Sequence, residues 1–220
     1  MKICRNIFIV LLLLTLALSG CGREEEIQAP EGKQVTLGTV EEGVYENTYL
    51  GVRFAPANWQ IQGAEELGST LREAKKMLEG SDLEENPDDQ VQIMDMQAVS
   101  PDGLMNTNVI YTKMSSAEWL SNLSMDDNKA LDQILSQKDA IIDSYRQIGV
   151  QVHSVEKAAL NFAGIQRLGI KITASLEASP CHILQYYERT LGAYSAVVTM
   201  TSLQEDHTAE IAEMYESLNP

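Results

Sequence analysis

Histidine and cysteine are scarce in this 220-residue chain, which contains three of each. The histidines, His153, His182 and His207, do not have the spacing of metal ligands, and no CxxC or HxxxH pattern occurs. Cys181 precedes His182 on an expected strand, where successive side chains point to opposite faces, so a Cys–His nucleophilic pair is disfavoured. A G-x-S-x-G elbow and a glycine-rich phosphate loop are also absent from the sequence. The sequence therefore indicates no catalytic residues, no metal ligands and no cofactor.

Basic residues are also few. Lysine and arginine number 16 against 32 acidic residues, which gives a formal charge of −16. The first twenty residues hold two of the bases and no acid, so residues 21–220 carry 14 basic and 32 acidic residues, a charge of −18. Such a surface repels phosphate backbones, and we expect no nucleic-acid partner. The acidity is typical of a solvated exterior or of a cation-binding role, and we favour the solvated exterior.

A hydrophobic run long enough to span a membrane is missing. The longest apolar stretch runs from Ile7 to Leu18, which is 12 residues interrupted by Thr15. Spanning the hydrocarbon core takes about 20 residues. The stretch follows Lys2 and Arg5, and this order of positive and apolar residues is typical of an export signal.

The export signal ends in a cysteine. Residues 18–21 read LSGC, which resembles the lipobox of bacterial lipoproteins: leucine, a small residue, glycine or alanine, then cysteine. The resemblance implies cleavage before Cys21 and attachment of a lipid with fatty acids such as palmitate to its thiol. The alternative is an ordinary signal peptide with a coincidental cysteine, but the position and flanks favour a lipoprotein. Cys4 leaves with the signal, so Cys181 has no partner for an internal disulfide.

The sequence divides into three segments. Residues 1–20 are the expected signal peptide. Residues 21–43 are rich in Glu and Gly with little periodic apolar content, so we expect an acidic flexible tether. Residues 44–220 are long enough for one hydrophobic core, and we expect them to form a single domain. This arrangement predicts an exported domain held by the lipid on Cys21 at the outer face of a bacterial cell membrane.

Hydrophobic periodicity predicts an alternation of strands and helices within this domain. The expected elements are a hairpin within 44–61, a helix over 64–80, strands at 90–99 and 108–114, one long helix from 127 to 148, strands at 150–160, 166–176, 181–191 and 194–203, and a last helix reaching residue 218. Val197 and Val198 make the final strand apolar on both faces, as in a central strand. Ser202 and Glu205 have the spacing of a capping box for the last helix.

Short turns between these strands imply antiparallel neighbours, and the helices must bury their apolar stripes on the sheet. We therefore expect an α/β (α+β) domain, with a mainly antiparallel sheet flanked by helices in an α/β/α sandwich. Acidic residues cluster at 82–89 and at Asp126 and Asp127. The calcium-loop pattern is absent, so we favour a solvated loop over a cation site at 82–89, and favourable placement at a helix N-terminus for the aspartate pair.

Two aromatic and turn-forming motifs lie near the two ends of the domain. The first comprises Asn47, Tyr49, Gly51, Val52, Phe54, Pro56 and Trp59, and the second comprises Tyr186, Tyr187, Arg189, Gly192 and Tyr194. Residues 44–219 thereby resemble the PsbP-like fold, and in particular the small bacterial lipoproteins with that fold that are related to DcrB. The resemblance implies a scaffold that binds partners without catalysing reactions. Trp59 fits core packing better than a ligand platform, and the tyrosine pair should divide between core and surface.

These observations favour a membrane-anchored, non-catalytic interaction module of unknown molecular activity at the cell envelope. Its expected partner is an unknown protein or envelope component. The alternative is a small-molecule or cation-binding accessory lipoprotein, and an enzyme is the least favoured class. The sequence does not indicate which residues bind a ligand.

Overall fold

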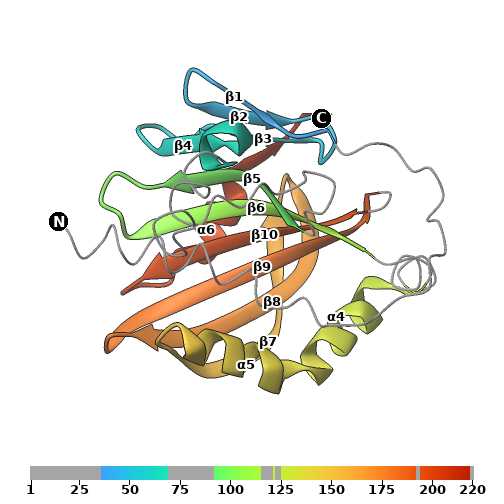
Figure 1. Ribbon diagram of the computed structural model, residues 1–220, viewed down its shortest axis with the longest axis vertical. Helices are drawn as coiled ribbons and strands as arrows, with labels where there is room; N and C mark the ends of the chain where they lie inside the picture. Colours follow the sequence, from blue (N-terminus) through green and yellow to red (C-terminus); the bar gives the residue numbers. More distant parts are fainter. Residues whose placement is uncertain (1–35, 69–91, 115–120, 122–124, 192–193, 219–220) are drawn as a thin grey trace, which may run out of the picture.

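Figure 1 shows a computed structural model of the chain. The structure describes residues 36–68, 92–114, 121, 125–191 and 194–218. Cys21, residues 21–35 of the expected tether and the acidic segment 82–89 lie outside these residues and stay predictions. Within the part of the chain that the structure describes, no helix has both the length and the apolar character needed to cross a membrane.

A seven-stranded antiparallel sheet forms the centre of the domain (Figure 1), with the strand order β4-β5-β6-β10-β9-β8-β7. Its strands are β4 (Gln60–Gly63), β5 (Gln92–Val99), β6 (Met105–Lys113), β7 (Val150–Phe162), β8 (Ile165–Leu176), β9 (Ser179–Leu191) and β10 (Tyr194–Leu203). The central position of β10, between β6 and β9, confirms the prediction made from its two apolar faces.

Each face of this sheet is covered differently. On one face, α4 (Asp127–Ser136) and α5 (Lys138–Gln147) pack over β7, β8 and β9 and bury Ile170, Ile172 and Ile183. On the other lie α6 (Thr208–Glu213) and a four-stranded sheet of order β1-β2-β3-β11. That small sheet consists of β1 (Thr39–Glu41), β2 (Val44–Asn47), β3 (Val52–Phe54) and β11 (Tyr215–Ser217). The expected fold class, a mainly antiparallel sheet flanked by helices, is confirmed, and the small sheet shares a layer with α6.

Aromatic side chains fill the core between the two sheets. The ring centres of Phe54 and Tyr215 are 4.6 Å apart, and those of Phe162 and Tyr215 are 4.7 Å apart. Trp59 meets Phe54 edge to face with a 5.5 Å separation of ring centres. Such ring pairs stabilise a core beyond the area they bury, so the contacts of Trp59 agree with the packing role expected for it.

The prediction of one long helix over 127–148 is wrong in one respect, because the helix is interrupted at Gln137 and divided into α4 and α5. The Ser136 hydroxyl donates to the Gln133 carbonyl at 2.6 Å, and the Gln137 N–H donates to the Ile134 carbonyl instead. A serine that bonds back to a carbonyl three or four residues earlier competes with the helical ladder and bends it. The break lies directly after Ser136, where the Gln137 N–H bonds to the Ile134 carbonyl.

The prediction for the C-terminal helix is also wrong, both in the length of the helix and in the capping box of Ser202 and Glu205. Helix α6 begins at Thr208 and ends at Glu213, and Tyr215–Ser217 pairs with β3 instead. The Ser202 hydroxyl accepts the N–H of His207 at 3.0 Å and does not cap a helix with Glu205. Pairing between strands about 160 residues apart supplies the backbone hydrogen bonds here, and local periodicity does not report such a contact.

The folded part of the chain starts earlier than expected. Strand β1, within the segment taken as tether, pairs with β2 through Thr39↔Glu46. The Gly38 N–H donates to the Asp95 carboxylate at 2.8 Å. The expected domain start at Val44 is therefore too late, because partners elsewhere in the fold stabilise this polar stretch. Of the helix expected over 64–80, residues 64–68 are helical and the others lie outside the described residues.

Gly169 lies where β8 and β9 approach closely. A Cβ at this position would be 2.4 Å from the Gln185 carbonyl oxygen, closer than atoms can pack. We expect Gly169→Ala to lower the free energy of unfolding by about 1–3 kcal/mol, because the two strands must move apart. Urea denaturation measures the change.

Gly68→Ala is the control, since a Cβ there meets nothing within 4 Å. We expect its effect to stay within about 1 kcal/mol. Equal midpoints for Gly169→Ala and the wild type would show that the strands are not in close contact.

Candidate functional site

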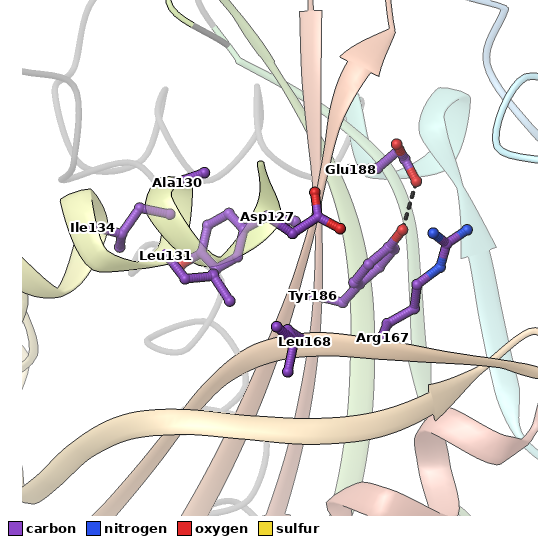
Figure 2. Close-up of a pocket in the computed structure, with 9 residues that line it drawn as sticks. Asp127, Ala130, Leu131, Ile134, Arg167, Leu168, Tyr186 and Glu188 are labelled. Atoms are coloured by element: carbon purple, nitrogen blue, oxygen red, sulfur yellow. Dashed lines mark hydrogen bonds between the residues drawn. The ribbon is translucent and has the colours of Figure 1, made fainter. Parts of the chain in front are cut away.

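Strands β8 and β9 separate at one end of the large sheet. Their pairing runs from Leu176↔Ser179 to Gly169↔Tyr186 and stops there. Beyond this point, residues 165–168 pair with β7 and residues 187–191 follow β10. The sheet thus opens into a fork, and the first turns of α4 lie beside it (Figure 2).

A cavity of about 80 Å³ lies in this fork, and we call it the fork cavity. One part of its wall is apolar and comes from Ala130, Leu131, Ile134 and Leu168. Another part carries ionisable or hydroxyl groups from Asp127, Arg167, Tyr186, Tyr187 and Glu188. Convergence of a few polar groups with an apolar wall is typical of small-ligand sites.

Among the described residues that line the fork cavity, Arg167 is the one basic residue. Its guanidinium carbon lies 5.9 Å from the centre of the Tyr186 ring, within range of a cation–π interaction. Its Nε is buried without a hydrogen-bond partner, and no ion pair among the described residues involves Arg167. A buried donor without an acceptor costs free energy, so this guanidinium can still accommodate an anionic group.

Tyr186 connects the charged groups of the fork cavity. Its hydroxyl donates to Glu188 Oε2 at 2.5 Å (Figure 2). Burial raises the pKa of Tyr186, and the nearby charges of Glu188 and Asp127 raise it further, while Arg167 lowers it. The phenol therefore stays protonated at neutral pH and acts as a donor. The described lining of the fork cavity thus combines the carboxyl groups of Asp127 and Glu188, the guanidinium of Arg167 and an apolar wall.

A second polar cluster lies inside the core, around Asp95. The Tyr45 hydroxyl and the Asn47 amide each donate to Asp95 Oδ2 at 2.7 Å, and the Gly38 N–H donates to Oδ1 at 2.8 Å. The Asn47 amide also donates to the Tyr111 hydroxyl at 2.9 Å. Asp95, Tyr45, Asn47 and Tyr111 are all 0% exposed. Because no substrate can reach it, this cluster holds the structure together and is not a site of chemistry.

A third cluster attaches α6 to β8. Lys171 Nζ lies 2.5 Å from the Asp206 carboxylate and also donates to the Thr208 hydroxyl. Burial raises the pKa of Asp206, but hydrogen bonds from Lys171 and Thr208 outweigh it, and the net shift is downward. His182 Nδ1 stands 4.0 Å from the same carboxylate. These groups satisfy one another, so they fix the start of α6.

The three histidines have different hydrogen-bond or ion-pair partners. His153 contacts Ser175, and His207 lies 3.0 Å from Glu210. Within the described residues no group of three or more histidine, cysteine or acidic side chains could hold a metal ion. Cys181 is fully buried, and burial raises the pKa of its thiol to about 11, so it is not a thiolate at neutral pH.

The aspartates at 126 and 127 lie at the start of α4, as predicted. The Asp126 carboxylate accepts the Lys129 N–H at 2.9 Å, and this hydrogen bond lowers the pKa of Asp126. Tyr186 and Tyr187 divide between the two faces of the sheet, with Tyr186 more deeply buried. Tyr186 also lines the fork cavity, a role that the sequence did not indicate.

Arg167 and Glu188 are the residues that sequence reasoning missed. Arg167 precedes Leu168 on β8, and alternation places the two side chains on opposite faces of the strand. The fork places Arg167 at a cavity. A lone arginine on a strand carries no local signal of such an environment.

We expect Asp95→Asn to change the pH dependence of stability. Burial raises the pKa of Asp95 and hydrogen bonds from Tyr45, Gly38 and Asn47 oppose the rise. A raised pKa means that the ionised form costs stability, so the contribution of Asp95 is most favourable at acid pH and declines as pH rises through the folded-state pKa. The difference in unfolding free energy, wild type minus variant, should therefore fall between pH 4 and 7, measured by urea denaturation.

Asp102→Asn is the control of opposite sign. Hydrogen bonds from Ser100 and the Leu104 N–H lower the pKa of Asp102. Its stabilising contribution is present above its unfolded-state pKa and is lost on acidification. The unfolding free energy of the wild type minus that of Asp102→Asn should therefore rise with pH. Identical trends for the two variants would contradict the assignment of Asp95 as a buried, costly charge.

Comparisons with known proteins identify a structural neighbour and no sequence relative. No protein-family model matches the chain, and no curated protein matches it by sequence. One structural neighbour is the solution structure of cyanobacterial PsbP (CyanoP) from Synechocystis sp. PCC 6803. It is 14% identical, the match covers 91% of this chain and 98% of that chain, and the TM-score is 0.41. At this level the likeness transfers neither a function nor the role of any residue.

Proposed function

We propose that this protein is an exported lipoprotein that is anchored through Cys21 and whose domain works by binding, without catalysis. The observation that carries the anchor is the sequence LSGC at 18–21, at the end of the 12-residue stretch Ile7–Leu18 that is apolar except for Thr15 and that follows a positively charged start. The small residues at 19 and 20 permit close approach of a peptidase, and a thiol is readily alkylated. The partner is a protein or another component of the cell envelope.

The lipid would hold the domain near the membrane without pressing it onto the surface. Each buried methylene contributes about 0.8 kcal/mol, so two fatty-acid chains give stable anchoring. The negative charge of residues 21–220 repels anionic headgroups. The segment 24–26, which is three glutamates, would lie closest to that surface. Both features favour a domain that faces away from the bilayer and is free to meet a partner.

The described residues support binding over catalysis. Burial raises the pKa of Asp95 and raises that of Tyr45 well above its ordinary value, but both residues are sealed in the core. The described residues that line the fork cavity include no histidine, cysteine, serine or threonine that could act as a nucleophile or in an acid–base pair. What the cavity does provide is fixed charge beside apolar surface, which holds a ligand.

A small-molecule-binding role is the second candidate, and the fork cavity is the observation that favours it. Cation binding has less support, since it rests on the acidic segment 82–89, outside the described residues. The two candidates share the anchor and differ in what the domain binds.

Cys21→Ala tests the anchor. In a bacterial host, the wild type should incorporate an alkyne-labelled palmitate analogue and sediment with membranes. The variant should lose the label and enter the soluble exported fraction, because the acceptor thiol is gone. Cys181→Ala is the control and should keep both label and membrane association. Label on the Cys21→Ala protein, or its continued retention on membranes, would overturn the proposal.

A further inference from the structure

We propose that the fork between β8 and β9 binds an extended peptide segment of a partner protein, which adds to the open edge of β8 as a strand. The inference rests on the proposed binding function of the domain, whose partner it names by chemical class, and it does not depend on the lipid anchor. Two features carry it: backbone groups of β8 that have no strand partner, and an apolar wall beside them.

The open edge belongs to a strand that is otherwise inside the sheet. Over residues 169–176, β8 pairs with β7 on one side and with β9 on the other. Over residues 165–168 it pairs with β7, and no other described strand pairs with its second side. Ile165, at the start of this edge, is 51% exposed, the highest value among the large apolar side chains of the described residues.

Backbone groups of this edge point into the fork. The turn between β8 and β9 consists of residues 177–178, both with positive φ, and Leu176 before it is paired with the residue after it. A pair that flanks such a turn exchanges both backbone hydrogen bonds, and every second residue along the strand repeats this orientation. Counting back from Leu176, the N–H and C=O groups of Gln166 and Leu168 point to the side where pairing with β9 has ended. Among the described residues no turn or loop hydrogen bond involves these groups.

An extended peptide is the ligand that fits unpaired strand backbone. Its N–H and C=O groups alternate with the same period as those of the edge, so it can pair with Gln166 and Leu168 as β9 pairs with the rest of β8. A folded sheet would not enter the fork, because β9 and the first turns of α4 flank it. The segment that binds is therefore extended and separate from the fold of its own protein.

The fork cavity adds a pocket for one side chain of the peptide. The described part of its wall includes aliphatic surface from Leu131, Ile134 and Leu168, and Leu168 belongs to the open edge itself (Figure 2). A volume of about 80 Å³ accommodates one short side chain, and burial of an aliphatic group against this surface is favourable. Backbone pairing thus supplies affinity, and the pocket supplies a preference for a short aliphatic residue.

The outer edge of β7 is the competing place for strand addition. Its register with β8 shifts between Val152 and Ser154, and Lys157 lies near its middle. Bulges and lysines on an edge strand hinder pairing with another chain. Residues 165–168 have neither a register shift nor a lysine, so the fork is the better site.

Amide hydrogen exchange, followed by NMR on the full chain in detergent, tests the inference with two blocked peptides. Acetyl-Val-Thr-Val-Thr-Val-amide is neutral and extended. Its analogue that is N-methylated at every residue keeps the side chains and loses the backbone donors. We expect the first peptide to bind with a Kd of about 0.1 mM or tighter. At about ten times that concentration it should slow exchange of the Gln166 and Leu168 amides about tenfold, and the N-methylated peptide should not.

One substitution removes a donor of the open edge. Gln166→Pro deletes the N–H that points into the fork and breaks no hydrogen bond between strands, and proline is tolerated at such positions. It should weaken peptide binding by about tenfold or more. Gln151→Ala, at an exposed position on β7, is the control and should bind as the wild type does. Thermal unfolding checks the fold of each variant, and the exchange measurement on the wild type decides the question if Gln166→Pro does not fold.

Several outcomes would overturn the inference. Slow exchange of Gln166 and Leu168 without peptide would show that the edge is already occupied, and protection of β7 amides would place the peptide at the outer edge of the sheet. Equal effects of the two peptides, no effect of either on the folded wild type, or unchanged affinity in folded Gln166→Pro would exclude strand addition. None of these concerns the labelling of Cys21, so failure here is distinguishable from failure of the proposed anchor.

Discussion

The hydrogen bonds to the buried carboxylate of Asp95 hold the two sheets of this protein together. A carboxylate without contact to water is costly unless donors surround it. Here the donors come from Gly38, Tyr45 and Asn47, all at or near the β1–β2 hairpin, whereas Asp95 lies on β5 of the large sheet. If the small sheet moved away from β5, the Asp95 carboxylate would lose its hydrogen-bond donors. The free-energy cost of a buried carboxylate without donors therefore favours a single position for the β1–β2 hairpin.

A β-bulge makes this arrangement possible. The register of β5 with β6 shifts between Met94 and Met96, at Asp95. In a regular strand Asp95 and Met96 would point to opposite faces, but the extra residue of a bulge re-aims its side chain. Both residues are fully buried; Asp95 bonds to Tyr45 and Met96 packs in the core between the sheets. The bulge thus directs a charged and an apolar group into one layer.

The same layer determines the shape of the fork cavity. The ring centres of Phe162 and Tyr186 are 4.7 Å apart, and Phe162 also packs on Tyr215, which packs on Phe54 of the small sheet. Tyr186 is therefore the last ring in a series that begins on the small sheet, and its outer side lines the cavity beside Arg167. The rigidity of that series fixes the position of the phenol that donates to Glu188. Packing far from the cavity in sequence thereby orients its polar wall.

The sequence by itself determined the strands from β5 to β10, the central place of β10, the position of Asp126 and Asp127 at the start of α4 and the packing role of Trp59, because alternation, turn residues and helix-terminal charges act within a few positions along the chain. It also supports the lipobox prediction at Cys21. Only the tertiary structure decided the pairing of β11 with β3, the early start of the fold at β1, and the meeting of Arg167 with Glu188. The two strand pairings join segments that are distant in sequence, and the meeting of Arg167 with Glu188 depends on where β8 and β9 separate. The physical reason is that packing across the whole sheet sets the register and separation of its strands, and no local sequence pattern encodes that packing.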